Sequence, residues 1–435
     1  MARRTLDAGL KRLEGRFDDN YFLFGTYTLF VSGCVLMASQ EIAHYLFLLV
    51  VLPLAFRKAA QLYALRSPSE VSGGLCPSRA QIAGTTIPVT LCAAVIYLLA
   101  LILSSALQKR TIAIEELVPL FIVTFEIIAF LLVTALLVVS QKGFLNGCLA
   151  ALAIVAAANA LVAIIVFIAS TPFNQLSYDR LGDAAWAPGE RLGVASLVIN
   201  SGILLVASVA VLLEGIRSVW IRTLLTSSAL ILACALILSQ SRSVLLAAAA
   251  GLAVSCRWSW RLITAAAITL ALLTLIFINV PSVHDAALRR GDSRRFEIWR
   301  HYVESVLNQP WLGSGMIEKI GFESKDGLVI AHPHNLILSA AVKGGVFAAA
   351  AMIIILVGGL YYSARYAQMT GQRAPLGIIT TLLVAGLFDY DLVIGSFPSW
   401  QVIPFWFPIG ICIGTELYVS SRRNNDHSRI RSQRV

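Results

Sequence analysis

Two histidines stand where a long polar stretch of the chain meets a hydrophobic run, in the sequence Ala331-His332-Pro333-His334-Asn335-Leu336. They are two of only six histidines in 435 residues. An imidazole has a reference pKa of about 6.5, so it can take up or release a proton near neutral pH. This pair is therefore suited to proton transfer on a substrate held at a membrane surface.

Arginines stand in three segments between residues 191 and 300. Arg191 directly precedes a hydrophobic run, and Arg242 lies in a polar break between two such runs, Ser239-Gln240-Ser241-Arg242-Ser243. The polar stretch before the histidines carries five more, Arg289, Arg290, Arg294, Arg295 and Arg300. A guanidinium group binds phosphate through two parallel hydrogen bonds. The pattern indicates a site for an anionic, phosphate-bearing ligand.

Simpler roles are open for the same residues. An arginine near the membrane plane can be an interfacial anchor, and Arg289, Arg290 and Arg300 fit a surface that faces solvent or lipid phosphate. The histidines could cap a helix or lie at the interface. A zinc site is a weaker alternative, because no third ligand follows the His-x-His pair at ligand spacing. We expect no metal and no cofactor.

Acidic residues add two open questions. Asp389 and Asp391 could bind a divalent ion, but two carboxylates at that spacing are a weak signal. Glu126 stands in the middle of a hydrophobic run, where a charge is costly unless it faces a partner or a cavity. The sequence does not name that partner.

Composition decides which elements position these residues. The chain is 58% hydrophobic and 13% charged, with repeated apolar runs of about 20 residues. In hydrocarbon each backbone polar group must be satisfied within its own segment, so these runs must be helices, and a β-barrel would show short alternating segments instead. The predicted fold is an all-α, polytopic membrane protein.

About twelve membrane spans are predicted, and the eighth is short for a crossing, at roughly 18 Å. The predicted ranges are 21–38, 42–56, 82–107, 117–140, 144–170, 194–213, 223–238, 244–255, 262–280, 336–361, 376–393 and 400–419.

Charge orients this bundle and divides it into parts. Most of the 34 basic residues fall on one side if both termini are cytoplasmic, as the positive-inside rule expects. The net charge of +10 then reflects topology and contact with anionic lipid, so we expect no nucleic-acid partner. The expected parts are an N-terminal transmembrane bundle (1–280), a large outer loop (281–335), and C-terminal transmembrane helices with a basic cytoplasmic tail (336–435).

Two connections, 171–193 and 281–335, are long and fall on the outer side, where long loops tend to carry function. The second contains a predicted amphipathic helix. Asp292 or Ser293 is available to cap it and Pro310 ends it. Its apolar residues at helical spacing are Phe296, Trp299, Tyr302, Val303 and Val306. Such a helix would lie on the membrane or cap the bundle.

Together these segments resemble the O-antigen ligase and polymerase superfamily. The resemblance rests on the break at 239–243, on Arg295-Phe296-Glu297-Ile298-Trp299, on Pro310-Trp311-Leu312-Gly313-Ser314-Gly315, and on His334-Asn335 with nine residues before Gly345. The last spacing is typical of the ligases and is the most specific feature. Two positions depart from the family pattern, Ala348 where glycine is usual and Lys343 where an acidic residue is common.

The resemblance implies a glycosyltransferase of the outer, periplasmic face of the bacterial inner membrane, similar to the lipid-carrier-dependent GT-C enzymes. It would move a glycan from undecaprenyl pyrophosphate to a sugar hydroxyl on lipid A-core, by an inverting and metal-independent displacement. His334 would be the base. Arg191, Arg242 and Arg295 would bind the pyrophosphate, His332 would shape the site, and Asn335 would orient His334 or cap the next helix.

Two alternatives stay open. One is a related enzyme with the same donor, either a polymerase of O-antigen or exopolysaccharide or a protein O-oligosaccharyltransferase. The other is a lipid or glycan transporter, which would need charged residues along a path through the spans. Glu126 is the clear mid-span charge in the sequence, so a transporter is favoured less.

Overall fold

The computed structural model describes residues 22–34, 44–64, 87–108, 114–140, 143–171, 181, 194–256, 295–316, 321–323, 329–330, 332–388 and 402–432.

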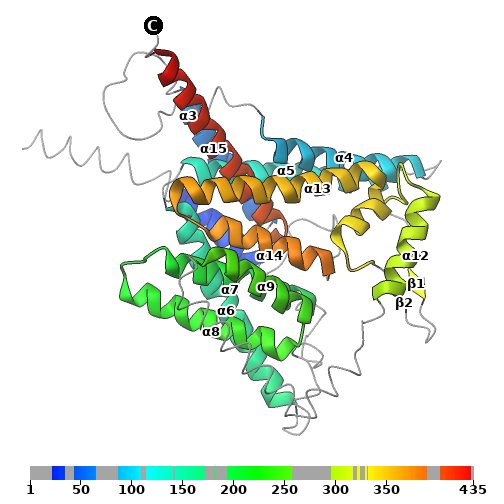
Figure 1. Ribbon diagram of the computed structural model, residues 1–435, viewed down its shortest axis with the longest axis horizontal. Coiled ribbons are helices and arrows are strands. Elements are labelled where there is room, and N and C mark those ends of the chain that lie inside the picture. Colours follow the sequence, from blue (N-terminus) through cyan, green and yellow to red (C-terminus); the bar gives the residue numbers. More distant parts are fainter. Residues whose placement is uncertain are drawn as a thin grey trace, which may run out of the picture.

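The described chain is almost entirely helical (Figure 1). Its elements are helix Phe22–Cys34, a π-helical turn η1 (Phe47–Val51) running into α3 (Leu52–Ala64), α4 (Val89–Gln108), α5 (Ile114–Ser140), α6 (Phe144–Ser170), α7 (Val194–Leu213), α8 (Val219–Ser239), α9 (Arg242–Ser255), α12 (Arg295–Asn308), α13 (Leu336–Thr370), α14 (Ala374–Phe388) and α15 (Trp406–Ser432). Two short antiparallel strands, β1 (Phe322–Glu323) and β2 (Val329–Ile330), pair between α12 and α13.

Leucine, isoleucine, valine and alanine dominate these helices, because apolar side chains tolerate lipid and a helix satisfies its own backbone. Among the described residues, five helices are long and apolar enough to cross a membrane, namely α4, α5, α6, α8 and α13. A helix overlaps every predicted span except 262–280, which lies outside the described residues. The helical, polytopic class is therefore confirmed, and the count of twelve spans stays a prediction.

Small residues let α9 and α14 approach closely. A Cβ on Gly251 would meet the Thr381 side chain, and a Cβ on Gly377 would meet the Ser255 side chain. As residue numbers rise along α9 they fall along α14, so the two helices are antiparallel. The N-terminus of α9 and the C-terminus of α14 therefore lie at the same end of the bundle.

The opposite end of this helix pair is tied by one carboxylate. Glu214, directly after α7, accepts hydrogen bonds from the backbone N–H groups of Arg373 (3.1 Å) and Ala374 (3.4 Å), where α14 begins. The Arg373 guanidinium in turn donates to the Cys256 carbonyl at the end of α9 (3.0 Å). Burial raises the pKa of Glu214, offset in part by the Asn146 side chain and these N–H groups. Glu214 thus joins the end of α7 to the start of α14, and Arg373 joins that start to the end of α9.

Helix α13 is broken at Gly345, where φ is +69° (Figure 1). In an unbroken helix the Val346 N–H would donate to the Val342 carbonyl. Here the Val346 N–H donates to the Pro310 carbonyl (2.8 Å), and the Val342 carbonyl accepts from the Ser314 N–H (2.7 Å) and hydroxyl (3.0 Å). The turn at 310–316 thus takes over hydrogen bonds that the break releases.

The same turn packs against the end of α4. The Lys343 carbonyl accepts from the Gly315 N–H (3.0 Å) and from the Ser104 hydroxyl (2.9 Å), and the Met316 N–H donates to the Ser105 hydroxyl (2.9 Å). A Cβ on Gly345 would collide with the Trp311 carbonyl. The break, the turn and α4 therefore form one interlocked unit.

Helix α12 lies across the end of α13 rather than alongside it (Figure 1). Its buried residues Ile298 and Tyr302 form a small core with Val342 of α13, against which Trp299 and Val306 pack. The predicted apolar residues of α12 have two environments. Tyr302 is buried against α13 with Trp299 and Val306 beside it, whereas Phe296 and Val303 are exposed.

Candidate functional site

The two histidines lie on a short segment that α12 binds through two side-chain hydrogen bonds. The Trp299 indole N–H donates to the Pro333 carbonyl (2.9 Å), and the Tyr302 hydroxyl donates to the Ile330 carbonyl (2.9 Å). Trp299 and Tyr302 are three residues apart and so share one side of the helix. One side of α12 therefore fixes the segment immediately before His334.

The histidines themselves are half-buried and close together. The His332 and His334 ring centroids are 4.1 Å apart, and the ring planes make an angle of 60°. His334 has φ +50°, in the left-handed region that histidine seldom adopts. Both imidazoles are thus presented at one place, just before α13 begins.

Asn335 has the capping role that the sequence left open. Its side-chain oxygen accepts from the Leu338 N–H (2.9 Å), which makes it the N-cap of α13. Its amide nitrogen donates to the Leu387 carbonyl near the end of α14 (3.1 Å). Asn335 therefore fixes the residue after His334 to two helices.

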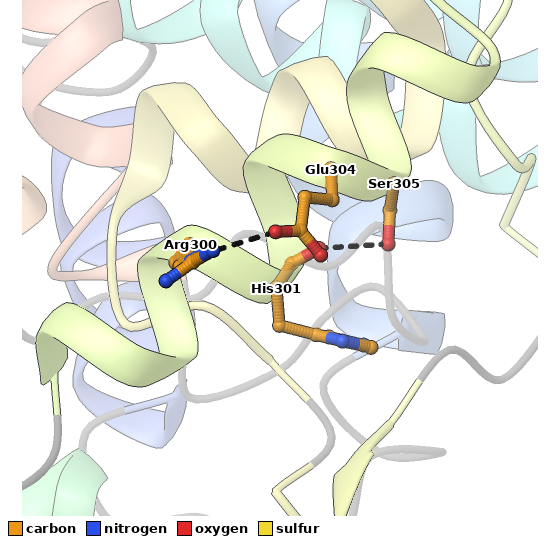
Figure 2. Close-up of polar contacts among 4 residues, drawn as sticks. All are labelled: Arg300, His301, Glu304 and Ser305. Carbon is orange, nitrogen blue, oxygen red and sulfur yellow. Dashed lines mark hydrogen bonds and ion pairs between the residues drawn. The ribbon is translucent and has the colours of Figure 1, made fainter.

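The two arginines of α12 lie on different sides of the helix. Arg295 is half-buried, and it precedes Ile298 and Trp299 by three and four residues, so it shares the side that faces the histidine segment. Arg300 is exposed and pairs with Glu304 one turn along (3.2 Å). Figure 2 shows this pair, with the His301 ring pointing to another side of the helix. The structure separates the two arginines that the sequence grouped together.

Arg242 is the first residue of α9, at a tight junction with α8. Gln240 ends α8 with φ +53°, and its N–H donates to the Ile237 carbonyl (3.1 Å). Ser241 stands at the N-cap position of α9, and its hydroxyl lies 3.3 Å from the Ser243 hydroxyl. The predicted polar break is thus a helix-to-helix turn that leaves the Arg242 side chain exposed at a helix N-terminus. Helix α9 has 14 residues, which confirms that this apolar segment is short.

Arg242 and His334 lie at the same end of the bundle. The antiparallel packing places the start of α9 level with the end of α14, and Asn335 binds that end of α14. Leu181, from the first long connection, donates its N–H to the Leu238 carbonyl near the end of α8 (3.0 Å). Both long connections therefore reach this end. Arg191 lies outside the described residues.

Glu126 has a partner that the sequence did not identify. His44 Nδ1 lies 3.1 Å from Glu126 Oε1, and the glutamate side chain is almost fully buried. His44 is therefore the partner that a carboxylate in the middle of α5 requires. Asp389 and Asp391 lie outside the described residues, so a metal site there is untested.

Sequence reasoning missed the residues that hold the candidate site rather than those that line it. Trp299 was assigned only an apolar role, although an indole N–H is a donor that normally finds a partner when buried. Gly345 was recognised only as a matching position, and its structural role is the break in α13. Ala348 is fully buried and packs next to Gly344, which explains why a small residue stands there.

Fold and candidate site define a polytopic helical membrane protein with a histidine segment and two arginines at one end of its bundle. Residues 227–353 match a family model described as O-antigen ligase. The chain is also similar to an O-antigen ligase of Pseudomonas aeruginosa, with 26% identity over 175 residues, 37% of this chain and 40% of the relative. The chain thus matches about two fifths of that relative's length. These comparisons support an assignment to the O-antigen ligase family, as the sequence motifs predict.

Proposed function

We propose that the protein transfers an O-antigen glycan from undecaprenyl pyrophosphate to a sugar hydroxyl of lipid A-core. The observation that carries the proposal is the histidine segment, which α12 and Asn335 hold at the end of the bundle that also bears Arg242 and Arg295. All of these residues fall inside the segment that matches O-antigen ligase.

In this reaction the acceptor hydroxyl oxygen attacks the anomeric carbon of the lipid-linked glycan. Its proton passes to the His334 imidazole, the bond from the anomeric carbon to the pyrophosphate oxygen breaks, and the configuration inverts. The leaving group is undecaprenyl pyrophosphate. His332, whose ring touches that of His334, shapes the site.

Arginines and helix ends supply the positive charge for the leaving group. Arg191, Arg242 and Arg295 bind the pyrophosphate, and each charge-assisted hydrogen bond contributes about 1.5–3 kcal/mol. Arg242 also stands at the N-terminus of α9, where backbone N–H groups and the helix dipole favour an anion. The charge that develops on the pyrophosphate is thereby stabilised by the protein itself.

The same proposal fixes the orientation in the membrane. Both termini are cytoplasmic and the candidate site faces the periplasm, where the lipid-linked donor and lipid A-core would meet. The basic residues near the chain ends support this orientation, because short cytoplasmic segments are rich in lysine and arginine.

His334→Ala tests the base. In cells that lack the gene, the wild-type protein should restore O-antigen on lipopolysaccharide gels, whereas H334A should restore none while reaching the membrane at normal levels. H301A is the matched control, because His301 lies on α12 outside the histidine segment, and it should restore O-antigen. Near-normal O-antigen with H334A would disprove the assignment.

The gel also separates the related functions. Core without O-antigen, together with accumulated lipid-linked polymer, supports the ligase. Core that carries a single repeat would indicate a polymerase instead. A block in the arrival of lipid-linked glycan at the outer face would indicate a transporter.

Arg295 and Arg300 form a matched pair for the donor site. R295A should lower transfer by about tenfold or more, because charge-assisted hydrogen bonds to the pyrophosphate are lost. R300A should stay within about twofold of wild type, because its exposed ion pair with Glu304 contributes little. The initial rate with a lipid-linked donor in detergent measures both. Equal losses in the two variants would contradict a specific role for Arg295.

A further inference from the structure

Helix α12 has a second apolar side that no described residue covers. Phe296, Val303 and Leu307 lie within about 40° of one another around the helix. Their exposed fractions are 70%, 44% and 70%. The buried residues Ile298 and Tyr302 are on a different side. One side of α12 thus binds the histidine segment. The exposed stripe formed by Phe296, Val303 and Leu307 does not contact α13.

The helix cannot place the stripe in lipid by crossing the membrane. Helix α12 has 14 residues and carries Arg295, Glu297, Arg300 and Glu304. A crossing helix needs about 20 predominantly apolar residues. Large apolar side chains grouped on one side of a short, charged helix are instead typical of helices that lie in a membrane surface.

The stripe is continuous with the surface of a membrane-spanning helix. Trp311, four residues beyond Leu307, is 67% exposed, and its ring lies 6.2 Å from that of Phe347 on α13. Val346 and Phe347 are exposed as well, and the outer side of α13 continues with Ile353, Ile354 and Val357. Helix α13 has the length and hydropathy of a membrane span, so we expect this exposed apolar side to face lipid.

Helix α12 lies beside the ends of two candidate membrane spans, α4 and α13. The turn that follows it binds Ser104 and Ser105, close to the end of α4, which is also a candidate span. In Figure 1, α12 lies across the end of the bundle, where these helices stop. Tryptophan, present here as Trp299 and Trp311, is enriched at membrane interfaces.

We propose that α12 is seated on the bilayer surface, with Phe296, Val303, Leu307 and Trp311 among the lipid headgroups and upper acyl chains. Lipid, rather than a second copy or another protein, is the occupant because the stripe runs into the lipid-facing side of α13. The adjoining side of α12, which carries Trp299 and Tyr302, binds the carbonyls of Pro333 and Ile330. The seating therefore sets the height of the His332–Asn335 segment above the membrane.

Spin-label accessibility tests this placement in the full chain. A ketone-bearing amino acid at position 303 or 307, coupled to a hydroxylamine nitroxide, leaves the seven native cysteines untouched. The protein is studied in nanodiscs of phosphatidylethanolamine and phosphatidylglycerol. Oxygen partitions into lipid, whereas a nickel chelate stays in water. Labels at 303 and 307 should collide more with oxygen than with the chelate.

Positions 297 and 304 are the matched controls. Glu297 and Glu304 are exposed on a neighbouring side of the same helix, so their labels should favour the nickel chelate. The proposal fails if labels at 303 and 307 also favour the chelate. It fails equally if they are shielded from both reagents and show spin–spin broadening, which would indicate a second copy. Because the experiment reads position and not transfer, its outcome is independent of the proposed reaction.

Discussion

The backbone of His334 is held in a conformation that costs free energy. A φ of +50° at a residue with a Cβ costs about 1–2 kcal/mol, so neighbouring contacts must maintain it. On one side, Trp299 binds the Pro333 carbonyl, and on the other, Asn335 caps α13. Such maintained strain is typical of residues whose side chain must point in one direction.

Trp299→Phe removes the indole donor and keeps an aromatic ring in the small core. We expect kcat for transfer to fall about fivefold to tenfold, because one hydrogen bond of about 1 kcal/mol no longer fixes the segment before the proposed base. The KM values for donor and acceptor should change little. Steady-state rates with purified protein measure this split.

Tyr302→Phe is the comparison for that variant. It removes an equivalent hydrogen bond to the Ile330 carbonyl, four residues before His334, and should lower kcat less. If W299F and Y302F lower melting temperature and kcat in the same proportion, the effect of Trp299 is on stability alone, and its positioning role is wrong.

At the scale of elements, the break in α13 depends on a glycine that has no room for a side chain. Gly345 has φ +69°, and a Cβ there would strike the Trp311 carbonyl. Gly371, which ends the same helix, has φ +79° and nothing within 4 Å of the Cβ position. Both glycines have a positive φ, and they differ in ψ and in the space around them.

Gly345→Ala should therefore destabilise the protein more than Gly371→Ala. At Gly371 (φ +79°, ψ −7°) alanine pays about 1–2 kcal/mol for the left-handed backbone, whereas Gly345 (φ +69°, ψ −165°) has a conformation that essentially only glycine adopts. G345A also adds about 1–3 kcal/mol of overpacking against the turn. Melting temperatures in detergent measure the difference. Equal losses would show that the inserted turn does not need a glycine at 345.

The elements were predictable to different degrees. Long apolar runs such as 117–140 and 144–170 predicted α5 and α6 closely. In hydrocarbon a segment must pair its own backbone polar groups, and a helix does so. The break in α13 was not predictable from its own sequence, since Gly344-Gly345 also fits an unbroken membrane helix. The hydrogen bonds released by the break go to the 310–316 turn. Local periodicity does not predict which distant segments bind each other.

At the scale of the whole molecule, the two ends of the bundle are stabilised in different ways. Arginines and histidines collect at the end that carries the candidate site. The other end of the α7, α9 and α14 group is held by the buried Glu214 carboxylate. The sequence predicted which residues gather at the first end through charge and loop length, but it gave no sign of Glu214.

Glu214→Gln should make the protein more stable at higher pH. Burial raises the pKa of Glu214, so the stabilisation linked to its protonation is complete below about pH 4.3, the ordinary value. That stabilisation is lost as pH rises through the raised pKa. Glutamine stays neutral and can still accept from Arg373 and Ala374.

The melting temperature of E214Q minus that of wild type should therefore grow between pH 4 and 8, over roughly the range in which a raised carboxyl titrates. E304Q, at an exposed carboxylate of α12, is the control and should show no such growth. A difference that is constant, or that grows on acidification, would contradict the prediction.

The candidate site was predictable as a set of residues but not as an arrangement. His334, Arg242 and Arg295 could be named because their charge and position beside apolar runs are unusual. That Arg295 faces the histidines while Arg300 faces away follows from which side of α12 meets α13. That contact depends on Val342, a residue with no polar signal of its own.

The inserted turn also bears on how the chain is made. Residues 310–316 leave the ribosome before α13 does, and the Ser104–Ser105 end of α4 is made earlier still. The carbonyls of Val342 and Lys343 and the N–H of Val346 therefore have partners already synthesised when they reach the membrane. A helix with such a break would be costly to insert alone, because its unpaired groups would face hydrocarbon. The order of translation removes that obstacle.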